Sequence, residues 1–516
     1  MIKPLRIAAS TGVLTILATA VASAHYHPLP SHSVRLDPFG HMTRLLRPPT
    51  QQEKRDAAAS GWTEITATAP FGSNGAGTAV LLTDGTVLIH DNSSNWYKLT
   101  PSSSGSYVGG SWSQVASLPS GYAPLYYADA VLPDGRLIIE GGEYNNGQDA
   151  WTTDGAIYDP VQNTWTSVSP PSGWTTVGDA PGAVLPNGTF MLGNCCSGQA
   201  ALLDPSNLTW SSTGTGKADS NNEEGWSLLP NGDVLTVDVE PPVSPALNSE
   251  VYNPSTGGWS SAGSTVVNLV NEQYYEIGPS VLMANGILFA TGATGATALY
   301  DTATGKWSKG PSFPKSGFSQ LDVADGPGAL LPTGDVLVAT SPGVYETNSQ
   351  FFEYNGKKLK PLTGPPNAKQ DSSYDYRMVM LPTGQVLVTD GSNDVEIFTA
   401  TGKTLKGIEP TITSVPTSLT PGSTYSVSGT YLNGFSQDGA YGDDAQEATN
   451  YPLVRISYSN GTVYYARTHD FTSMAVASSA SSSASFDVPA GIPTGSAQLE
   501  VVTNGVPSKA VAVTIQ

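Results

Sequence analysis

The chain is poor in charged residues and has only two cysteines. Charged side chains make up 13% of its 516 residues, against roughly 25% in typical soluble domains. Two cysteines exclude a framework of several disulfides and a zinc site built from several thiolates. After residue 24 no apolar stretch is long enough to span a membrane, so we expect no membrane span. A G-x-S-x-G element and a phosphate-binding glycine loop are also missing, which argues against the hydrolase and nucleotide-binding classes that use them.

Positive charge is scarce as well. The formal net charge is −20, and residues 1–55 contribute +5 to it, so the remainder carries −25 (−20 − 5). A surface this acidic repels phosphate backbones, and nucleic acid is therefore excluded as a partner. The charge favours cations, neutral glycans or basic surfaces instead.

The first 24 residues have the organisation of a secretory signal peptide. Lys3 and Arg6 precede an apolar run over residues 7–21, and an A-x-A cleavage site ends at Ala24. We therefore expect a secreted, extracellular protein. Sequons for N-glycosylation, which fit a secreted glycoprotein, begin at Asn92, Asn187, Asn207 and Asn460.

A polar, proline-bearing segment follows over residues 25–55 and ends in Lys54-Arg55. A dibasic pair at this place is typical of a propeptide that is removed, and the alternative is a disordered leader that stays attached. The folded part of the chain is expected to begin at residue 56.

One hairpin motif repeats along the chain, in the form VLPDGRLIIEGG at residues 131–142. Apolar residues lead into a turn with glycine, and an aliphatic strand leaves it. The turn glycines lie 44 to 54 residues apart, at Gly85, Gly135, Gly188, Gly232, Gly286, Gly334 and Gly384. A period near fifty residues with four short strands per unit indicates a β-propeller of kelch type with seven blades.

The seventh unit ends after its third strand, at residues 395–398, and lacks a fourth. A segment with strand character and a tryptophan, GWTEIT with Trp62, is available at the other end of the repeats. We predict that this N-terminal strand completes the last blade and closes the ring, which leaves no large open edge. The propeller would then occupy residues 56–407.

The period is lost near residue 407, and alternating apolar and polar segments follow to the C-terminus. This pattern of short strands predicts an immunoglobulin-like β-sandwich over residues 408–516. The predicted fold class is therefore all-β, a seven-bladed kelch-type β-propeller followed by an immunoglobulin-like β-sandwich.

Kelch hairpins followed by an immunoglobulin-like domain resemble the galactose oxidase and glyoxal oxidase superfamily. The resemblance implies a copper site with two tyrosines and two histidines, one tyrosine being thioether-linked to a cysteine. Tyr374-Asp375 stands where the family has a Tyr-His pair, and His469 matches the histidine of the C-terminal domain. Tyr126 and Asp179 stand where the cysteine and its partner tyrosine would lie. The radical cofactor cannot form from these residues, and we expect no copper.

Carboxylates recur at one point of the repeat, nine residues before the turn glycine. The residues at this point that are candidates for binding a ligand or cation are Tyr126, Asp179, Glu223, Asp325 and Asp375, with Glu276 one residue out of register. Tyr374, next to Asp375, is a further candidate from the family's tyrosine position. Propeller geometry would bring these positions to one mouth of the axial channel. Clustered carboxylates need a cation such as Ca²⁺, shared protons or a basic ligand to coexist. The alternative is that each acidic side chain bonds its own loop backbone.

Cys195 and Cys196 are adjacent and follow the second strand of the third hairpin. In an oxidising compartment they could form a disulfide between neighbouring residues. Such a ring would make a rigid apolar platform for a sugar. The alternative is a pair of buried thiols.

Three functions are consistent with these patterns. The first is a monomeric binding protein that holds a carbohydrate or cell-wall ligand at the acidic axial mouth, with exposed aromatics at Trp96, Tyr126, Tyr127 and Trp226. The second is a non-redox carbohydrate-active enzyme, a hydrolase or lyase that uses the carboxylate ring. The third is a diverged copper oxidase.

Overall fold

The computed structural model describes residues 35–36, 42–43, 47–442 and 447–516, and it is nearly all β. The helices of this part of the chain are α1 (Gln51–Ala59) and a 3-10 turn, η1 (Ser373–Asp375). None of the helices in these residues is long and apolar enough to cross a membrane. The predicted signal peptide, residues 1–24, lies outside the described residues.

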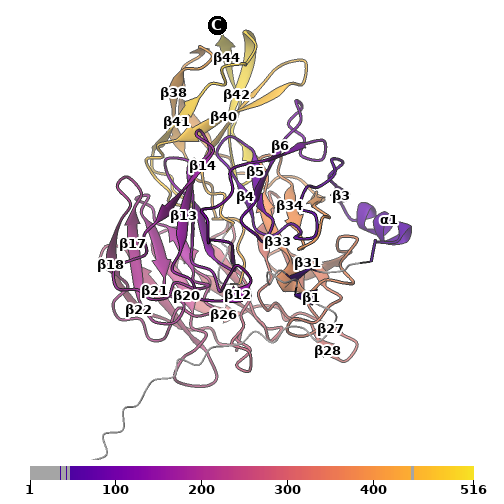
Figure 1. Cartoon of the computed structure of the whole chain (residues 1–516), viewed down its shortest axis with the longest axis vertical. Helices are drawn as coiled ribbons and strands as arrows, with labels where there is room; N and C mark the ends of the chain where they lie inside the picture. The colour runs from indigo at the N-terminus through magenta and orange to yellow at the C-terminus, as the bar shows by residue number, and fades with distance from the viewer. Residues whose placement is uncertain (1–34, 37–41, 44–46, 443–446) are drawn as a thin grey trace, which may run out of the picture.

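Within the described residues, seven four-stranded antiparallel sheets follow one another in a propeller-like arrangement (Figure 1). The first three consist of β4 (Ala79–Leu81), β5 (Val87–His90), β6 (Trp96–Thr100) and β7 (Ser111–Gln114); β9 (Ala128–Val131), β10 (Leu137–Glu140), β13 (Gly155–Asp159) and β14 (Thr164–Val168); and β15 (Gly182–Val184), β16 (Phe190–Gly193), β17 (Ala200–Asp204) and β18 (Thr209–Thr213). The next two consist of β19 (Ser227–Leu228), β20 (Val234–Val237), β21 (Asn248–Asn253) and β22 (Gly258–Ser264); and β23 (Ser280–Leu282), β24 (Ile287–Thr291), β25 (Thr297–Asp301) and β26 (Lys306–Lys309). The last two consist of β29 (Gly328–Leu330), β30 (Val336–Thr340), β31 (Gln350–Tyr354) and β32 (Leu359–Leu362); and β33 (Arg377–Met380), β34 (Val386–Thr389), β35 (Glu396–Phe398) and β3 (Trp62–Glu64).

Each sheet begins with the predicted hairpin. In the second sheet β9 and β10 pair antiparallel, with Val131 opposite Leu137, and Gly135 takes a positive φ of 83° in the turn. Strands buried on both faces explain the continuous aliphatic runs of this motif, since β9 and β10 are buried throughout. Smaller pairings lie outside the main sheets and involve β1 (Arg35–Leu36), β2 (Met42–Thr43), β8 (Pro124–Leu125), β11 (Tyr144–Asn145), β12 (Gln148–Asp149), β27 (Lys315–Ser316) and β28 (Ser319–Gln320).

The N-terminal strand completes the last sheet, as the missing fourth strand predicted. β3 pairs antiparallel with β35, and Trp62 lies opposite Phe398. The buried Trp62 ring packs 4.9 Å from Phe398 and 5.1 Å from Phe351, and its indole N–H donates to the Thr363 carbonyl at 2.8 Å. The two ends of the ring are thus joined by backbone pairing and by aromatic packing.

Helix α1 crosses the predicted boundary between leader and propeller at residue 55. It begins at a capping box in which Thr50 and Glu53 satisfy each other's backbone N–H groups. Arg47 anchors the segment to the propeller, because its N–H donates to Gln370 and its carbonyl accepts from the same side chain at 2.8 and 3.0 Å. Residues 47–55 are therefore docked on the propeller in this structure, and removal at Arg55 stays a prediction.

The C-terminal strands lie at one end of the molecule, above the hairpin turns of the propeller-like part (Figure 1). They are β36 (Thr411–Ser414), β37 (Ser418–Leu419), β38 (Thr424–Thr430), β39 (Leu453–Ser457), β40 (Val463–His469), β41 (Ser482–Asp487), β42 (Gly495–Thr503), β43 (Val506–Pro507) and β44 (Val511–Ile515). Contacts reach the first two hairpins: Arg467 donates to the Asp134 carbonyl at 2.8 Å, and the Thr468 N–H donates to the Thr83 carbonyl at 3.2 Å.

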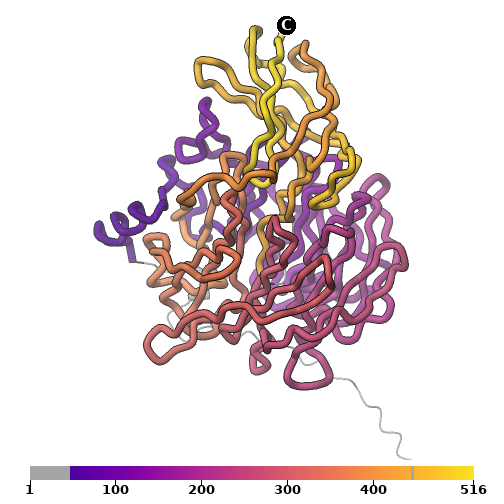
Figure 2. The backbone as a smooth tube through the Cα atoms, turned by 180° about the vertical axis from the view of Figure 1, so that it is seen from behind, coloured from indigo at the N-terminus to yellow at the C-terminus, as the bar shows by residue number. Residues whose placement is uncertain are grey.

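One loop of the C-terminal part descends between the seven sheets, which can be followed in Figure 2. Ala440 pairs with Gly328 at the start of β29 through two backbone hydrogen bonds of 2.8 and 2.9 Å. Gln437 accepts the Leu228 N–H at 2.7 Å. The C-terminal part therefore contributes backbone to the centre of the propeller-like part.

Candidate functional site

The site lies where the chain enters the first strand of each sheet, at the end opposite to the hairpin turns. We call the segments that lead into these strands the approach loops. Tyr126, Glu223 and Asp325, three of the positions in the predicted register, have left-handed backbones with φ of 53°, 57° and 49°. This sparsely populated conformation turns the chain sharply before each strand begins. Equivalent backbone turns thus place equivalent side chains at this end.

Three of the predicted carboxylates meet there. Glu223, Glu276 and Asp325 each offer one oxygen atom, and these atoms lie within 4.8 Å of one another. All three side chains belong to buried residues. Burial raises the pKa of Glu276 to about 7, although hydrogen bonds with Asp325 and Tyr345 oppose the rise. We call these three residues the axial cluster.

Tyr345 joins the axial cluster from the loop after β30. Its hydroxyl donates to Glu276 and lies 3.5 Å from an oxygen of Asp325. Burial, followed by the negative charge of Glu276, raises the pKa of Tyr345 well above its usual value, so the phenol stays protonated as a donor. Sequence reasoning missed Tyr345, although loops after the second strand of a hairpin return to this same end.

The C-terminal part approaches the axial cluster through Gly442. A β-carbon at this position would lie 2.8 Å from a carboxylate oxygen of Asp325 and 3.2 Å from the Ile277 carbonyl. Only a residue without a side chain permits so close an approach of backbone to carboxylate. This contact was not predicted, because the resemblance pointed to His469 as the contribution of the C-terminal part.

His469 lies elsewhere, at the end of β40. Its ring nitrogens are 2.8 Å from Asp470 and 3.2 Å from Asp487, in the C-terminal part near the hairpin turns. It therefore does not share a site with Tyr374, which lies at the opposite end of the sheets. Together with the lack of a cysteine at positions 126 and 179, this donor set does not fit the copper centre that the resemblance implies.

Tyr126, Tyr374 and Asp375 line a second part of the site, a cavity of about 70 Å³ that they share with Arg377. Asp375 accepts the Ser372 N–H at 2.7 Å, so one of its oxygens bonds its own loop, as the alternative interpretation predicts. It is not a member of the axial cluster.

Arg377, which sequence reasoning also missed, fixes one wall of this cavity. Its guanidinium lies 3.6 Å from the ring centre of Tyr441 and 5.9 Å from that of Tyr126. One of its N–H groups donates to the carbonyls of Tyr374 and Tyr376, at 2.9 Å each. A cation stacked on tyrosines thus stands beside the acidic mouth.

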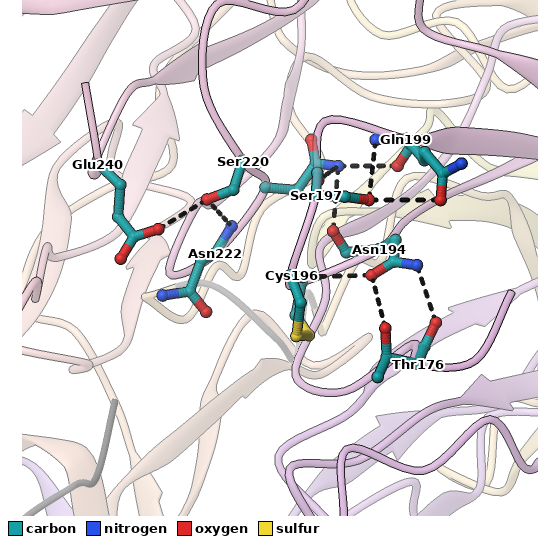
Figure 3. Close-up of a disulfide and its surroundings, with 10 residues drawn as sticks. Thr176, Asn194, Cys196, Ser197, Gln199, Ser220, Asn222 and Glu240 are labelled. Carbon is teal, nitrogen blue, oxygen red and sulfur yellow. Dashed lines mark hydrogen bonds between the residues drawn. A yellow bond between two sulfur atoms is a disulfide. The ribbon is translucent and has the colours of Figure 1, made fainter. Parts of the chain in front are cut away.

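Asp179 is not one of the three residues of the axial cluster, and it directly follows Gly178, which packs on the cysteine pair. Cys195 and Cys196 form a disulfide with their Cα atoms 3.8 Å apart, so the alternative of two thiols is wrong (Figure 3). Cys195 is buried and Cys196 is exposed. A β-carbon on Gly178 would lie 2.5 Å from the Cys195 sulfur, so the disulfide packs directly on the backbone that precedes Asp179.

The predicted exposed aromatics are mostly buried. Trp96, Tyr127 and Trp226 are at most 1% exposed. Trp96 stacks on His90 with ring centres 4.8 Å apart, and the Tyr127 hydroxyl lies 3.0 Å from the same histidine. The prediction was wrong for these three residues because packing between neighbouring sheets uses them. Tyr126 alone is half-buried.

A second group of carboxylates surrounds Lys217, and we call it the lysine cluster. The ammonium nitrogen lies 2.5 Å from Asp219, 2.8 Å from Glu224, 2.9 Å from Glu250 and 3.8 Å from Asp238, and all five side chains are buried. Burial opposes the charge of Lys217, but Glu224 and Asp219 outweigh it and hold the pKa of the lysine above its usual value. The positive charge that compensates these carboxylates therefore comes from a side chain of the protein.

The axial cluster can do two things chemically. Three carboxylate oxygens and a phenol are hard oxygen ligands, which Ca²⁺ prefers. Alternatively, Glu276 and Asp325 can share a proton that a substrate could take up.

Comparison with known proteins adds similarity of overall shape. No protein-family model and no curated protein matches the chain. Among solved structures, it is similar to a fungal alcohol oxidase of the AA5 family in complex with copper, with 14% identity and a TM-score of 0.48 over 89% of this chain and 100% of that chain. It is also similar to virginiamycin B lyase from Staphylococcus aureus, with 7% identity and a TM-score of 0.44 over 66% and 98%. At this level of similarity, what these neighbours bind or catalyse is a statement about those proteins alone.

Proposed function

We propose that this protein binds a carbohydrate or cell-wall ligand outside the cell, at an acidic mouth where the axial cluster holds a hard cation such as Ca²⁺. The observation that carries the proposal is the convergence of Glu223, Glu276 and Asp325, which lie in the approach loops of three different sheets. Buried carboxylates this close must share protons or bind a cation, because the low dielectric strengthens their repulsion.

The fold proposal that accompanies this function is a seven-bladed kelch-type propeller with an immunoglobulin-like sandwich. Seven sheets of equal strand number, and their closure by β3, support seven blades. The nine C-terminal strands form one continuous sheet in which β40 pairs with β39 on one side and with β41 on the other. All its pairings except that of β37 with β44 are antiparallel, which supports the sandwich.

A cation at the axial cluster would leave coordination positions for ligand oxygens. Ca²⁺ takes six to eight oxygen ligands, whereas three carboxylates and one phenol provide about four to seven. Sugar hydroxyls could fill the remainder. Tyr126 and Tyr374, together with the disulfide, offer apolar surface near the mouth.

A second function, a non-redox hydrolase or lyase, is favoured by the pKa of Glu276 of about 7, which suits a general acid. Retaining glycosidases use a pair of carboxyl groups about 5–5.5 Å apart. The axial cluster has three carboxylates, with one oxygen of each within 4.8 Å of the others, and the third carboxylate, which such a pair does not require, favours cation binding.

Calorimetric titration with Ca²⁺ tests the proposal. We expect one site in the wild-type protein, loss of binding in Asp325→Asn, and unchanged binding in Asp375→Asn, a matched control because Asp375 has the same register position but bonds its own loop. A glycan array with and without Ca²⁺ then identifies the ligand class. Absence of Ca²⁺ binding to the wild type, or equal binding by Asp325→Asn, would refute the cation site.

A further inference from the structure

The turn that carries the disulfide is held together by its own hydrogen bonds. Residues 194–199 connect β16 to β17, and the Asn194 N–H donates to the Gln199 carbonyl at 3.0 Å. The Asn194 side chain accepts the Cys196 N–H at 3.2 Å and exchanges bonds with Thr176 at 2.9 and 3.0 Å. In Figure 3 the disulfide extends from the side of the turn opposite to Gln199.

On one side this turn contacts the approach loop of the third sheet. The Cys195 N–H donates to the Val177 carbonyl at 3.0 Å, and the Cys195 sulfur packs on Gly178. The next residue along that loop is Asp179.

On its other side the turn is joined to the approach loop of the fourth sheet by Asn221. The buried Asn221 amide donates to the carbonyls of Asn194, Ser197 and Gln199, at 3.3, 2.8 and 2.8 Å. The Asn221 backbone N–H donates to Ser197 as well, at 3.0 Å. Two residues further on, Glu223 enters the axial cluster.

An ion pair holds the two ends of the approach loop of the fourth sheet. Lys217 and Glu224, at its two ends, are joined within the lysine cluster at 2.8 Å. Between them, Asn221 is held by the disulfide turn, which reaches solvent through Cys196. A change in the conformation of this turn would therefore displace Asn221 and, two residues further on, Glu223.

We propose that Cys195–Cys196 is a thiol-exchange site, open to a low-molecular-weight thiol, whose reduction weakens cation binding by Glu223. This inference rests on the proposed cation site. A thiolate attacks the exposed Cys196 sulfur and forms a mixed disulfide, while the Cys195–Cys196 bond breaks and Cys195 leaves as a thiolate that takes a proton. A second thiolate attacks the mixed disulfide, releases Cys196 and forms the oxidised disulfide of the reductant. Two thiols thus supply two electrons, and the protein gains two protons.

Reduction acts on the site because the ring constrains two adjacent residues. When the ring opens, the backbone at Cys195 and Cys196 regains freedom, and the three carbonyls that accept from Asn221 lose their fixed spacing. A buried amide that loses its acceptors is destabilised, so its loop shifts. Glu223 then leaves the position in which it completes the axial cluster.

The test compares Ca²⁺ affinity of the same protein in both redox states. Dithiothreitol is added and then removed without oxygen, and mass spectrometry of the intact protein confirms the gain of two hydrogens. We expect Ca²⁺ binding to weaken by about tenfold in the reduced protein, within the usual range of coupling between sites, and to recover on reoxidation. The variant Cys196→Ser, altered at an exposed position, should bind Ca²⁺ as the reduced protein does and should not respond to dithiothreitol. Hydrogen exchange of the backbone over residues 217–224 should increase in both.

The outcomes separate the two proposals. If both redox states bind Ca²⁺ equally, or if dithiothreitol leaves the disulfide of the folded protein intact, the thiol-exchange inference is overturned and the cation site stands. If neither state binds Ca²⁺, the proposed function itself fails.

Discussion

The molecule contains two buried clusters of carboxylates, and two adjacent residues belong to different ones: Glu223 to the axial cluster and Glu224 to the lysine cluster. The lysine cluster contains its own cation, Lys217, at hydrogen-bonding distance from three carboxylates. In the axial cluster a neutral hydroxyl, that of Tyr345, donates to Glu276. The lysine cluster thus has a positive counter-charge within the protein, whereas the positive charge that we propose for the axial cluster is an added cation.

The largest expected effect is the loss of stability when the internal cation, Lys217, is removed. Lys217→Met leaves buried carboxylates without their counter-charge, and the loss of one partner of a buried ion pair costs about 3–5 kcal/mol. Urea unfolding measures the free energy. The matched control is Lys360→Met, which removes a lysine that is 63% exposed and pairs with Glu353 at 3.1 Å, and it should cost less than about 1 kcal/mol. Equal stability of Lys217→Met and the wild type would show that the cluster is not structural.

Neutralising the axial cluster should have the opposite effect on the apo protein. Asp325→Asn relieves repulsion, so the free energy of unfolding without Ca²⁺ should stay equal or rise. The variant should lose the stabilisation by Ca²⁺, which for the wild type is about 2.7 kcal/mol at a concentration one hundred times the Kd. Thermal unfolding with and without Ca²⁺ measures both. Strong destabilisation of Asp325→Asn in the absence of Ca²⁺ would show that the axial cluster, like the lysine cluster, supports the structure.

Burial raises the pKa of one carboxyl in each cluster to about 7: Glu276 in the axial cluster and Asp238 in the lysine cluster. The pH dependence of Ca²⁺ affinity therefore tests which of the two clusters binds the cation. Glu276 is protonated in the folded protein below pH 7 and ionised in the unfolded chain above its usual pKa of 4.5. Its contribution to stability is therefore largest at low pH and is lost as the pH rises from 4.5 to 7. Ca²⁺ must displace this proton, so its affinity should rise about tenfold per pH unit up to pH 7.

Two variants assign that pH dependence. Glu276→Gln should abolish it, whereas Asp238→Asn should leave it in place, because Asp238 belongs to the lysine cluster. A pH dependence that follows Asp238 would contradict the separation of the two clusters.

The smallest expected effect is that of Tyr345→Phe. Loss of the hydroxyl removes a hydrogen bond that favours ionised Glu276, so the pKa of Glu276 should rise further and Ca²⁺ binding at neutral pH should weaken by about 1 kcal/mol. Tyr274→Phe is a matched control, since the Tyr274 ring packs 6.4 Å from Tyr345 without being part of the cluster. Calorimetry at pH 7 and pH 8 distinguishes a change of pKa, which matters more at pH 7, from the loss of a ligand.

Local patterns in the sequence predicted most of the fold. Turn glycines and aliphatic pairs determine each hairpin within a few residues, and the missing fourth strand identified Trp62 as the partner of the last sheet. The register of the repeat also identified Glu223, Glu276 and Asp325. It could not show that Asp375 bonds Ser372, because that depends on the turn η1 rather than on the repeat.

The rest of the site depends on contacts between distant parts of the chain. Gly442 reaches Asp325 because the C-terminal part lies above the sheets, and no local pattern in the sequence indicates where a loop of that part ends. Arg377 was missed for a related reason, because its partner Tyr441 comes from the same distant loop. The sequence pattern around Trp96 and Trp226 does not distinguish a side chain that lines the mouth from one that packs between two sheets.

Closure by β3 has a consequence for the order of events during biosynthesis. The strand β3 is synthesised before all other strands of the seven sheets, but it can pair only after β35 has been synthesised. Gly442 is synthesised later still. A nascent chain therefore has neither the closure by β3 nor the contact of Gly442 with Asp325 until these later residues have been made. The proposed cation uptake by the axial cluster would report that the C-terminal part has reached the sheets.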